Sequence, residues 1–232
     1  MDMNINKTWY LQKIEIFQDF SLDELKSVEN FFQHKYYYKR QQIYSSDDNS
    51  DRIYFVHTGR VKLTKISQDG REITIGIINP NEVFGEMALV DSAARNSFAI
   101  AMEDSLLTSI SKADLKRIIL QKPIVGLRLA KVIGERRRDA EQKLEDMVFK
   151  DVPSRLANLI LNFYKKNGKN NGKRVIDMRL IHNDIANLIG STRETTSANL
   201  SRFKREGLID FDNHRIVVLD EKKLELISQG VN

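Results

Sequence analysis

The spacing of apolar residues changes along the chain, and each change predicts a different kind of secondary structure. Residues 22–33 carry leucine, valine and phenylalanine at helical spacing, and Ser21 with Glu24 three residues later has the pattern of a capping box. Between Lys39 and Ser111, apolar and β-branched residues alternate with polar ones, which is typical of strands. Turn-forming residues separate these strands, at 57–60, 68–71 and 79–81. We therefore expect a short helix followed by a compact antiparallel β-roll.

Helical spacing returns after Ser111, which is placed to cap a helix that Pro123 interrupts. A longer helix is predicted from Ile124 to about Met147. Its apolar residues form a thin heptad-like stripe in a densely charged segment, and they are Leu129, Ile133, Ala140, Leu144 and Met147. A helix with so few apolar residues does not fit the centre of a core. We expect its stripe to pack against the same helix of a second copy, or else against the β-roll.

The segment after the long helix predicts a new domain. Asp151 can cap a helix, and Pro153 suits a first helical turn. The helix expected there has one apolar face, formed by Leu156, Leu159, Ile160 and Phe163. It ends in a tract of lysine, glycine and asparagine at 165–173, for which we expect a basic loop.

Residues 182–218 predict two helices, a sharp turn between them and a hairpin after them. The apolar positions of 185–189 fit one face of a short helix, Gly190 permits the turn, and Ser191 is expected to begin the second helix. The hairpin is predicted from two short apolar runs that flank a turn, at 208–211 and 215–218. This order is that of a winged helix-turn-helix.

The second helix of this motif is expected to have an inward and an outward face. Thr196, Leu200 and Phe203 recur at helical spacing, so we expect them to pack inward. The outward residues are then Arg193, Glu194, Ser197, Ala198, Ser201 and Arg202. An arginine there can bind guanine O6 and N7, a glutamate can accept from cytosine N4, and hydroxyl and backbone N–H groups can bind phosphate. The candidate DNA contacts are His182, Asn183, Ser191, Thr192, Arg193, Glu194, Thr195, Ser197, Ser201 and Arg202.

Some of these residues also have a purely structural interpretation. Ser191 and Glu194 have the spacing of a capping box, which alone would account for Glu194. Lys204 and Arg205 fit an ordinary solvated surface. Arg193 has no structural role that the sequence indicates.

Residues 83–97 predict a turn that binds an anion. Gly85 follows a strand and permits close approach of the backbone, and the residues after it open a short helical turn. Arg95 supplies a bidentate cation for a phosphate, and Glu86 can accept a ribose hydroxyl. The alternative is that Arg95 pairs with Glu86 at the surface. The candidate effector-binding residues are Gly85, Glu86, Met87, Ala88, Arg95, Asn96 and Ser97.

The net positive charge of the chain lies in its C-terminal part. The 232 residues have a formal net charge of +5. Residues 152–232 contain 14 Lys or Arg against 9 Asp or Glu, so the rest of the chain is balanced. Such an excess also arises by chance, but its segregation favours a nucleic-acid partner.

Composition excludes several classes of site. The chain has no cysteine, which excludes disulfides, thiolate zinc sites, cysteine-bound iron–sulfur clusters and thiol switches. Its histidines are scattered without metal-ligand spacing, so we assign no metal; they are His34, His57, His182 and His214. No nucleophile, base and orienting group can be assembled, which argues against an enzyme. We see neither a secretory signal nor an apolar run near the ~18 residues of a membrane span, so we expect a cytoplasmic protein.

Three motifs together resemble the Crp/Fnr superfamily of bacterial transcription regulators, and the resemblance spans nearly the whole chain. FGEMAL at 84–89 with Arg95 resembles the phosphate-binding cassette of cyclic-nucleotide-binding domains. IGSTRET at 189–195 resembles the start of the family's recognition helix, and FKDVPSRLA at 149–157 resembles its hinge and first DNA-domain helix. The resemblance implies an α+β fold. It consists of an N-terminal antiparallel β-roll (double-stranded β-helix) of the cyclic-nucleotide-binding type, a long central dimerisation helix and a C-terminal winged helix-turn-helix.

The resemblance also implies how function is divided along the chain. Residues 1–123 would form the effector domain, 124–150 the dimerisation helix and hinge, and 151–232 the DNA-binding domain. The implied partners are a second copy of the chain, a palindromic site on double-stranded DNA, and RNA polymerase. Contact with RNA polymerase is how an activator of this family works, although the sequence does not decide between activation and repression.

The chain departs from the family pattern at positions that set specificity. Members that depend on cyclic AMP typically bind adenine with Thr-Ser on the central helix, where this chain has Ala140-Glu141. Asn96 stands where a small residue commonly follows the arginine. A cyclic nucleotide is therefore one candidate effector, beside another nucleotide, a different anion or none. Ala198 replaces an arginine of many relatives, so we expect a related but different half-site.

The leading hypothesis is a sequence-specific regulator in which an effector changes the spacing of two recognition helices. These helices would enter successive major grooves, ~34 Å apart. One alternative is a constitutive regulator, which binds DNA without an effector. A second alternative, of a different functional class, is a cyclic-nucleotide sensor that acts on a protein partner. The basic tract at 165–173 and Arg193 favour DNA over a protein partner.

Overall fold

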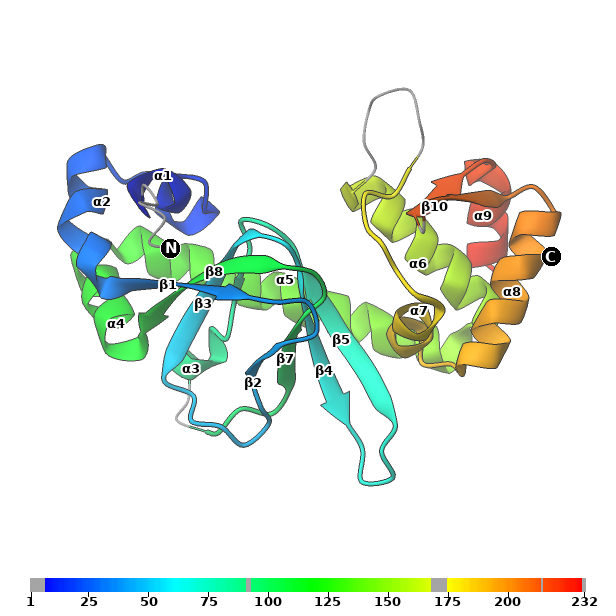
Figure 1. The fold of residues 1–232 in the computed structure, drawn as a ribbon, viewed down its shortest axis with the longest axis horizontal. Helices are drawn as coiled ribbons and strands as arrows, with labels where there is room; N and C mark the ends of the chain where they lie inside the picture. Colours follow the sequence, from blue (N-terminus) through cyan, green and yellow to red (C-terminus); the bar gives the residue numbers. More distant parts are fainter. Residues whose placement is uncertain (1–6, 91–92, 168–174, 214, 231–232) are drawn as a thin grey trace. The chain divides into compact units, whose positions relative to one another are not determined.

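The structure, a computed structural model, describes residues 7–90, 93–167, 175–213 and 215–230. The chain folds into two compact units, Met1–Arg138 and Asp139–Asn232. Strands dominate the first unit and helices the second, as Figure 1 shows.

The N-terminal unit is built on two four-stranded sheets whose strands all pair antiparallel. The first sheet has the order β1 (Phe32–Tyr37), β8 (Ser105–Ser111), β3 (Arg52–Thr58) and β6 (Val83–Phe84). The second has the order β2 (Gln42–Tyr44), β7 (Phe98–Ala101), β4 (Val61–Ile66) and β5 (Glu72–Ile78). The predicted β-roll is confirmed. The predicted hairpin joins β4 to β5, and Gly70 there has a φ of 81°.

Helices precede, interrupt and follow the strands. They are α1 (Lys7–Gln12), α2 (Leu22–Val28), α3 (Met87–Val90), α4 (Lys112–Gln121) and α5 (Pro123–Phe149), with 3-10 turns at Glu15–Phe17 and Glu29–Phe31. The capping box of α2 is confirmed, because Ser21 and Glu24 each accept a backbone N–H from the other. Ser111 caps α4 as predicted by accepting from the N–H of Asp114.

The helix predicted over 22–33 is too long. The structure ends it before Phe32, which starts β1 and lies opposite Ile110 of β8. Phe31 and Phe32 continue the helical spacing by coincidence, and pairing with a central strand outweighs that local signal.

Two apolar clusters form the core of this unit. One joins the facing sides of the two sheets and includes Tyr44, Val61, Phe84 and Leu107. The other joins the opposite side of the first sheet to the helices, with Phe17 in contact with Phe32 and Phe55.

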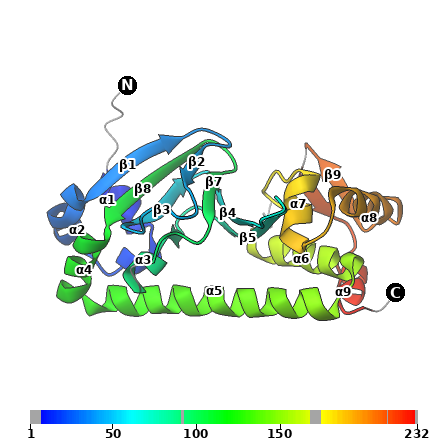
Figure 2. The same cartoon turned by 90° about the horizontal axis from the view of Figure 1, so that it is seen from below.

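Helix α5 is continuous over its length, as Figure 2 shows. Its predicted stripe does not act as one surface, because Leu129 is buried with Val125 in the helical cluster of the roll. Other apolar residues of α5 are exposed, namely Leu127 at 67%, Leu144 at 64% and Val148 at 64%. Docking on the roll therefore accounts for the first part of α5 only.

The C-terminal unit contains α6 (Val152–Asn167), α7 (His182–Ile189), α8 (Arg193–Arg205), β9 (Ile209–Asp212), β10 (Arg215–Val218) and α9 (Glu221–Ser228). Asp151 caps α6 as predicted, with its carboxylate accepting from the N–H of Ser154 at 2.9 Å. The buried face of α6 is formed by Leu156, Ala157, Ile160 and Leu161. Leu159 and Phe163, which we predicted there, are only half-buried because this face is rotated toward Ala157 and Leu161.

The predicted hairpin wing is confirmed, since β9 and β10 pair antiparallel. His214 in its turn lies outside the described residues, and so do positions 168–174 of the predicted basic loop. The first residues of that tract continue α6 to Asn167, so the prediction placed the end of the helix too early.

Candidate functional site

The predicted helix-turn-helix is formed by α7 and α8. Gly190 ends α7 in the left-handed conformation, with φ 61° and ψ 49°. Glycine adopts this conformation without steric cost, which lets the chain reverse between the two helices. Thr196, Leu200 and Phe203 are completely buried, as their spacing predicts.

The start of α8 differs from the prediction by one residue. Thr192, not Ser191, is the N-cap, and its hydroxyl accepts from the N–H of Thr195 at 3.2 Å. The proposed capping box between Ser191 and Glu194 is therefore wrong. Glu194 lies exposed in the first turn of α8 and does not cap the helix, so capping does not explain why a glutamate stands there.

The outward face of α8 is polar and largely exposed. Arg193, Glu194, Ala198 and Ser201 are all exposed. Arg193 makes no hydrogen bond or ion pair with any residue that the structure describes. Its guanidinium is therefore available to a ligand outside the unit.

Two residues predicted to face outward are only half-buried, and each has a partner within the unit. The hydroxyl of Ser197 shares a hydrogen bond with Nδ1 of His182 at 2.7 Å. Arg202 lies 3.9 Å from the carboxylate of Glu206, measured from Nε to Oε1. Binding by Ser197 or Arg202 would compete with these contacts.

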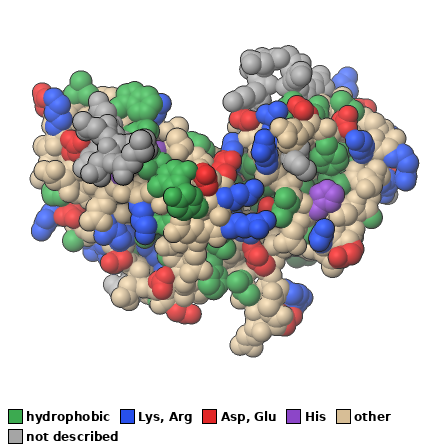
Figure 3. Space-filling model, in the orientation of Figure 1, with side chains coloured by type: hydrophobic (Ala, Val, Ile, Leu, Met, Phe, Trp, Pro, Cys, Tyr) green, Lys and Arg blue, Asp and Glu red, His purple; other side chains and the backbone are tan. Residues whose placement is uncertain are grey.

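The remaining candidate DNA contacts lie at the same end of the motif. His182 is the first residue of α7, followed by the exposed Asn183. Thr192 and Thr195 are exposed at the start of α8, and Ser191 is half-buried. The N-termini of both helices thus carry polar side chains, as a phosphate-binding surface requires. Figure 3 shows basic side chains spread over the visible face of the C-terminal unit.

Sequence reasoning missed a contact that supports the turn. Arg155 of α6 donates to the carbonyl of Lys150 at 3.0 Å and to that of Gly190 at 3.5 Å. Met147 of α5 packs on the same glycine, because a Cβ built on Gly190 would lie 2.8 Å from its Cε. An arginine that binds only carbonyls leaves no pattern in the sequence.

The phosphate-binding turn predicted at 83–97 begins at Gly85, which has a φ of 75°. Arg95 lies beside it, is 6% exposed, and donates to the carbonyls of Gly85 and Arg52. Its guanidinium carbon lies 4.4 Å from the centre of the Tyr44 ring. No carboxylate among the described residues pairs with Arg95. A buried cation without a counter-charge is costly, so this position suits an anionic ligand.

Glu86 has a different partner from the one we considered. Its carboxylate, 6% exposed, pairs with the guanidinium of Arg136 on α5, which also donates to the carbonyl of Val83. The alternative of a surface pair between Glu86 and Arg95 is therefore wrong. Glu86 is already engaged and would have to share Arg136 to accept a ribose hydroxyl.

The other predicted effector-binding residues differ in how far their side chains are exposed. Ala88 is fully buried and Met87 is 45% exposed. Asn96 is exposed, whereas Ser97 is 8% exposed and hydrogen-bonds the hydroxyl of Tyr44. Burial raises the pKa of the Tyr44 and Tyr54 hydroxyls while the charge of Arg95 lowers it, so both phenols stay neutral near pH 7.

The sequence did not single out Tyr44, Tyr54 or Arg136. The alternation of apolar and polar residues predicts the strands of the roll, but not which side chains meet at the turn. Nothing in that alternation indicates which ring lies under an arginine, or which of three consecutive arginines on α5 faces the turn.

Residues 34–122 match the family of cyclic nucleotide-binding domains, and residues 154–227 match the Crp-like helix-turn-helix domain. The chain belongs to the Crp/Fnr superfamily of transcription regulators. This Crp/Fnr chain combines both domains and regulates transcription.

Curated relatives agree with this assignment, and a solved structure shares the fold. The cyclic AMP receptor protein of Thermus thermophilus is 28% identical over 216 residues, which cover 93% of this chain and 97% of that protein. The global nitrogen regulator of a Synechocystis species is 29% identical over 184 residues, covering 78% and 81%. The structure of FixK2 from Bradyrhizobium japonicum has the same fold, with a TM-score of 0.75 at 24% identity, covering 84% of this chain and 96% of that one. No helix in the described part of this Crp/Fnr chain is long and apolar enough to cross a membrane.

Proposed function

We propose that this regulator acts as a homodimer that binds a two-fold-symmetric site on double-stranded DNA, with α8 in the major groove. The observation that carries the proposal is the surface of α8. Thr196, Leu200 and Phe203 anchor one face of the helix, and Arg193 and Glu194 extend from the other. Arginine and glutamate at that position suit a guanine and a cytosine edge.

Dimerisation along α5 is supported by its exposed apolar residues. Leu127, Leu144 and Val148 fall on the a and d positions of one heptad pattern, with Ala130 and Gly134 between them. An isolated helix that leaves such side chains in water gains free energy by pairing with its copy. Two recognition helices would then meet successive major grooves ~34 Å apart.

We propose three functional parts along the chain. Residues 1–123 would bind the effector, residues 124–150 would form the dimerisation helix and hinge, and residues 151–232 would bind DNA. Arg95 would bind the charged group of a small anion, assisted by the backbone at Gly85. A cyclic nucleotide is the first candidate, because a relative is named for cyclic AMP and the domain family for cyclic nucleotides. Ala140 and Glu141 do not supply the usual adenine contacts, which favours another nucleotide, a different anion or no effector over cyclic AMP itself.

The proposed action is binding, without a catalytic step. A ligand at Arg95 would favour one arrangement of the two subunits, and that arrangement would set the spacing of the α8 helices. Since the proposed target is double-stranded DNA, we expect the protein to act in the cytoplasm and to influence RNA polymerase.

Binding selection on random duplex DNA, run with and without cyclic AMP and cyclic GMP, tests this proposal. We expect a palindromic site whose half-site differs from the usual family sequence in one or more positions, because Ala198 lacks an arginine side chain. Selection of no palindrome would overturn DNA recognition by a dimer. Equal affinity with every ligand would leave a constitutive regulator, and recovery of the usual site at every position would refute the argument from Ala198.

A further inference from the structure

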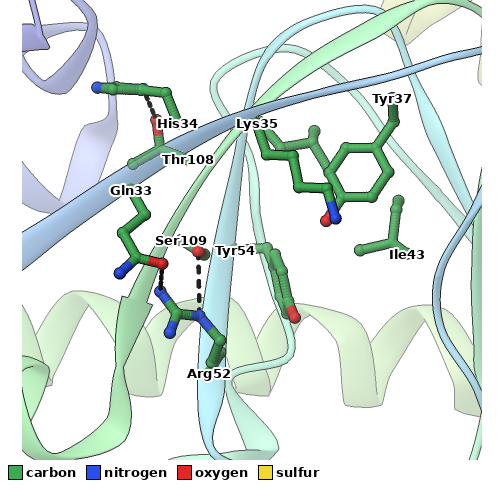
Figure 4. Close-up of a pocket in the computed structure, with 10 residues that line it drawn as sticks. Gln33, His34, Lys35, Tyr37, Ile43, Arg52, Tyr54, Thr108 and Ser109 are labelled. Carbon is green, nitrogen blue, oxygen red and sulfur yellow. Dashed lines mark hydrogen bonds between the residues drawn. The ribbon is translucent and has the colours of Figure 1, made fainter.

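A cavity of about 330 Å³ opens in the N-terminal unit beside β1, β3 and β8, and Figure 4 shows its lining. This volume lies at the small end of the range for ligand pockets, enough for a compound with a single ring. The lining residues come from these strands and from Ile43 of β2. None of them belongs to the turn at 83–97, although Tyr54 also lies beside that turn, with its ring centre 5.8 Å from the guanidinium carbon of Arg95.

One part of the lining is apolar and partly aromatic. Leu107 is 1% exposed and Tyr37 is 5% exposed, and the half-buried Ile43 lies next to them. Tyr54 adds the side of its ring, which stacks on Phe84 with a centroid distance of 5.1 Å. These side chains are fixed by the core and form a surface for a flat apolar group.

The other part of the lining carries two cations. Lys35 and Arg52 both line the cavity, and no Asp or Glu does. Neither side chain forms an ion pair with any residue that the structure describes. The amino group of Lys35 lies 5.0 Å from the centre of the Tyr37 ring, so the charge is next to the apolar part.

Arg52 is held in a fixed orientation. Its Nε donates to the hydroxyl of Ser109 at 3.1 Å, and its Nη2 donates to Oε1 of Gln33 at 2.7 Å. The third nitrogen of the Arg52 guanidinium, Nη1, takes part in neither of these two hydrogen bonds. A guanidinium oriented in advance by neutral partners can bind a carboxylate with little further loss of entropy.

We propose that this cavity binds a small organic acid, with an apolar ring against Tyr37 and Leu107 and its carboxylate on Arg52, while Lys35 adds a second positive charge beside Tyr37. The site is additional to the one at Arg95 and does not rest on the proposed DNA binding. The two sites are connected, because the backbone carbonyl of Arg52 accepts from Arg95 while its side chain lines the cavity. A bound acid would therefore influence the phosphate-binding turn.

Isothermal titration calorimetry of the full chain tests the proposal with three probes: benzoate, acetate and inorganic phosphate. We expect saturable binding of benzoate, and affinity at least about tenfold lower for acetate and phosphate, which lack the ring. Saturation by none of the probes would overturn the proposal. Equal affinity for benzoate and phosphate would overturn the role of the apolar surface.

Variants identify the cavity as the site. Lys35→Gln removes an exposed charge that forms no ion pair with any described residue, so it should fold normally and weaken benzoate binding about tenfold. Arg52→Lys should weaken it as well, because lysine keeps the charge but loses the planar fork. Lys65→Gln, a matched exposed lysine on β4, should bind as the wild type does. Equal effects of Lys35→Gln and Lys65→Gln would contradict the assignment.

A further measurement separates this cavity from the phosphate-binding turn, where Tyr44 lies beside Arg95. In protein labelled with 3-fluorotyrosine, benzoate should shift the ¹⁹F resonances of Tyr37 and Tyr54, assigned by Tyr→Phe substitution. A shift confined to other tyrosines would exclude the cavity.

Discussion

The carboxylate of Glu86, in the turn at 83–97, is paired with the guanidinium of Arg136 on α5. The Glu86 side chain is 6% exposed and that of Arg136 is 28% exposed, so the pair is largely shielded from water. Both residues belong to the N-terminal unit. Any ligand that displaces Glu86 must break a bond to α5, which links occupancy of the turn to the long helix.

Removal of Arg136 should destabilise the N-terminal unit. Arg136→Gln leaves a buried carboxylate unpaired, which costs about 3 kcal/mol or more. Urea unfolding measures the loss, and Arg138→Gln, which removes an exposed arginine from the same helix, is the control. Because the double variant Glu86→Gln/Arg136→Gln has no buried charge, it should lose less than the sum of the single variants. An unchanged urea midpoint for Arg136→Gln would contradict this account.

The contrast between Arg136 and the β-roll shows what the sequence can predict. The roll follows from alternation over many residues, and turns such as the one at Gly70 fix where its strands end. Arg136 is one of three successive arginines, and only the rotation of α5 on the roll decides which of them meets Glu86. That rotation depends on how Val125 and Leu129 fit the helical cluster, which is a property of tertiary packing.

The candidate DNA-binding surface was easier to predict than the effector site. The inward face of α8 follows directly from the spacing of Thr196, Leu200 and Phe203. The N-cap was misplaced because Ser191 and Thr192 are both good caps, and the left-handed Gly190 decides between them by setting where the chain turns. The carbonyl partners of Arg95 could not be predicted, because backbone acceptors carry no residue type.

Acid should destabilise the fold through His57. This residue is 6% exposed, and its Nε2 shares a hydrogen bond with Thr108 Oγ1, which lies 2.6 Å from Nδ1 of His34. The ring of Tyr10 packs 4.6 Å away, between centroids. Burial, and then the charge of His34, lowers the pKa of His57 from 6.5 to about 4.

The unfolded chain therefore binds a proton between pH 6.5 and 4 that the folded chain does not. The contribution of His57 is fully present above pH 6.5, and about 3 kcal/mol is lost as the pH falls to 4. Urea unfolding at pH 7 and pH 4.5 should show a smaller difference for His57→Gln than for the wild type. Identical pH dependence of the two proteins would show that His57 does not titrate in this way.

Gly190→Ala should destabilise the C-terminal unit. An alanine at a φ of 61° costs about 1–2 kcal/mol, and its Cβ would also displace the end of the Met147 side chain. Gly207→Ala is the matched comparison, because Gly207 has a φ of 70° but nothing within 4 Å of a Cβ. Thermal unfolding should rank Gly190→Ala as the more destabilised of the two. The reverse order would mean that the contact with Met147 is unimportant.

Leu144→Glu should shift the protein from dimer to monomer. Leu144 is 64% exposed, and a carboxylate at a d position of two paired helices would face its copy at high energetic cost. Sedimentation velocity measures the change, which we expect to be at least about a hundredfold in the dimer dissociation constant. Gln142→Glu introduces the same side chain on α5 away from the heptad positions and should remain dimeric. A wild-type protein that sediments as a monomer at all concentrations would refute pairing along α5.

Arg193→Ala should weaken specific DNA binding and relax it at one base pair in each half-site. A bidentate arginine contributes about 1–3 kcal/mol to discrimination between bases, and the dimer loses two of them, so we expect a loss of about thirtyfold to ten-thousandfold for the selected palindrome. Fluorescence anisotropy with the selected duplex and its single-base variants measures both effects.

Arg205→Ala provides the contrast, because Arg205 is exposed in the last turn of α8, away from the helix N-terminus. If it meets DNA at all, it contacts phosphate. Its removal from both subunits should then weaken every duplex equally and lower the slope of log affinity against log salt by about two, one for each subunit. Should Arg193→Ala show that same uniform loss and lower salt slope, Arg193 would be a phosphate contact, and the base preference of α8 would have to come from Glu194 and the hydroxyl side chains beside it.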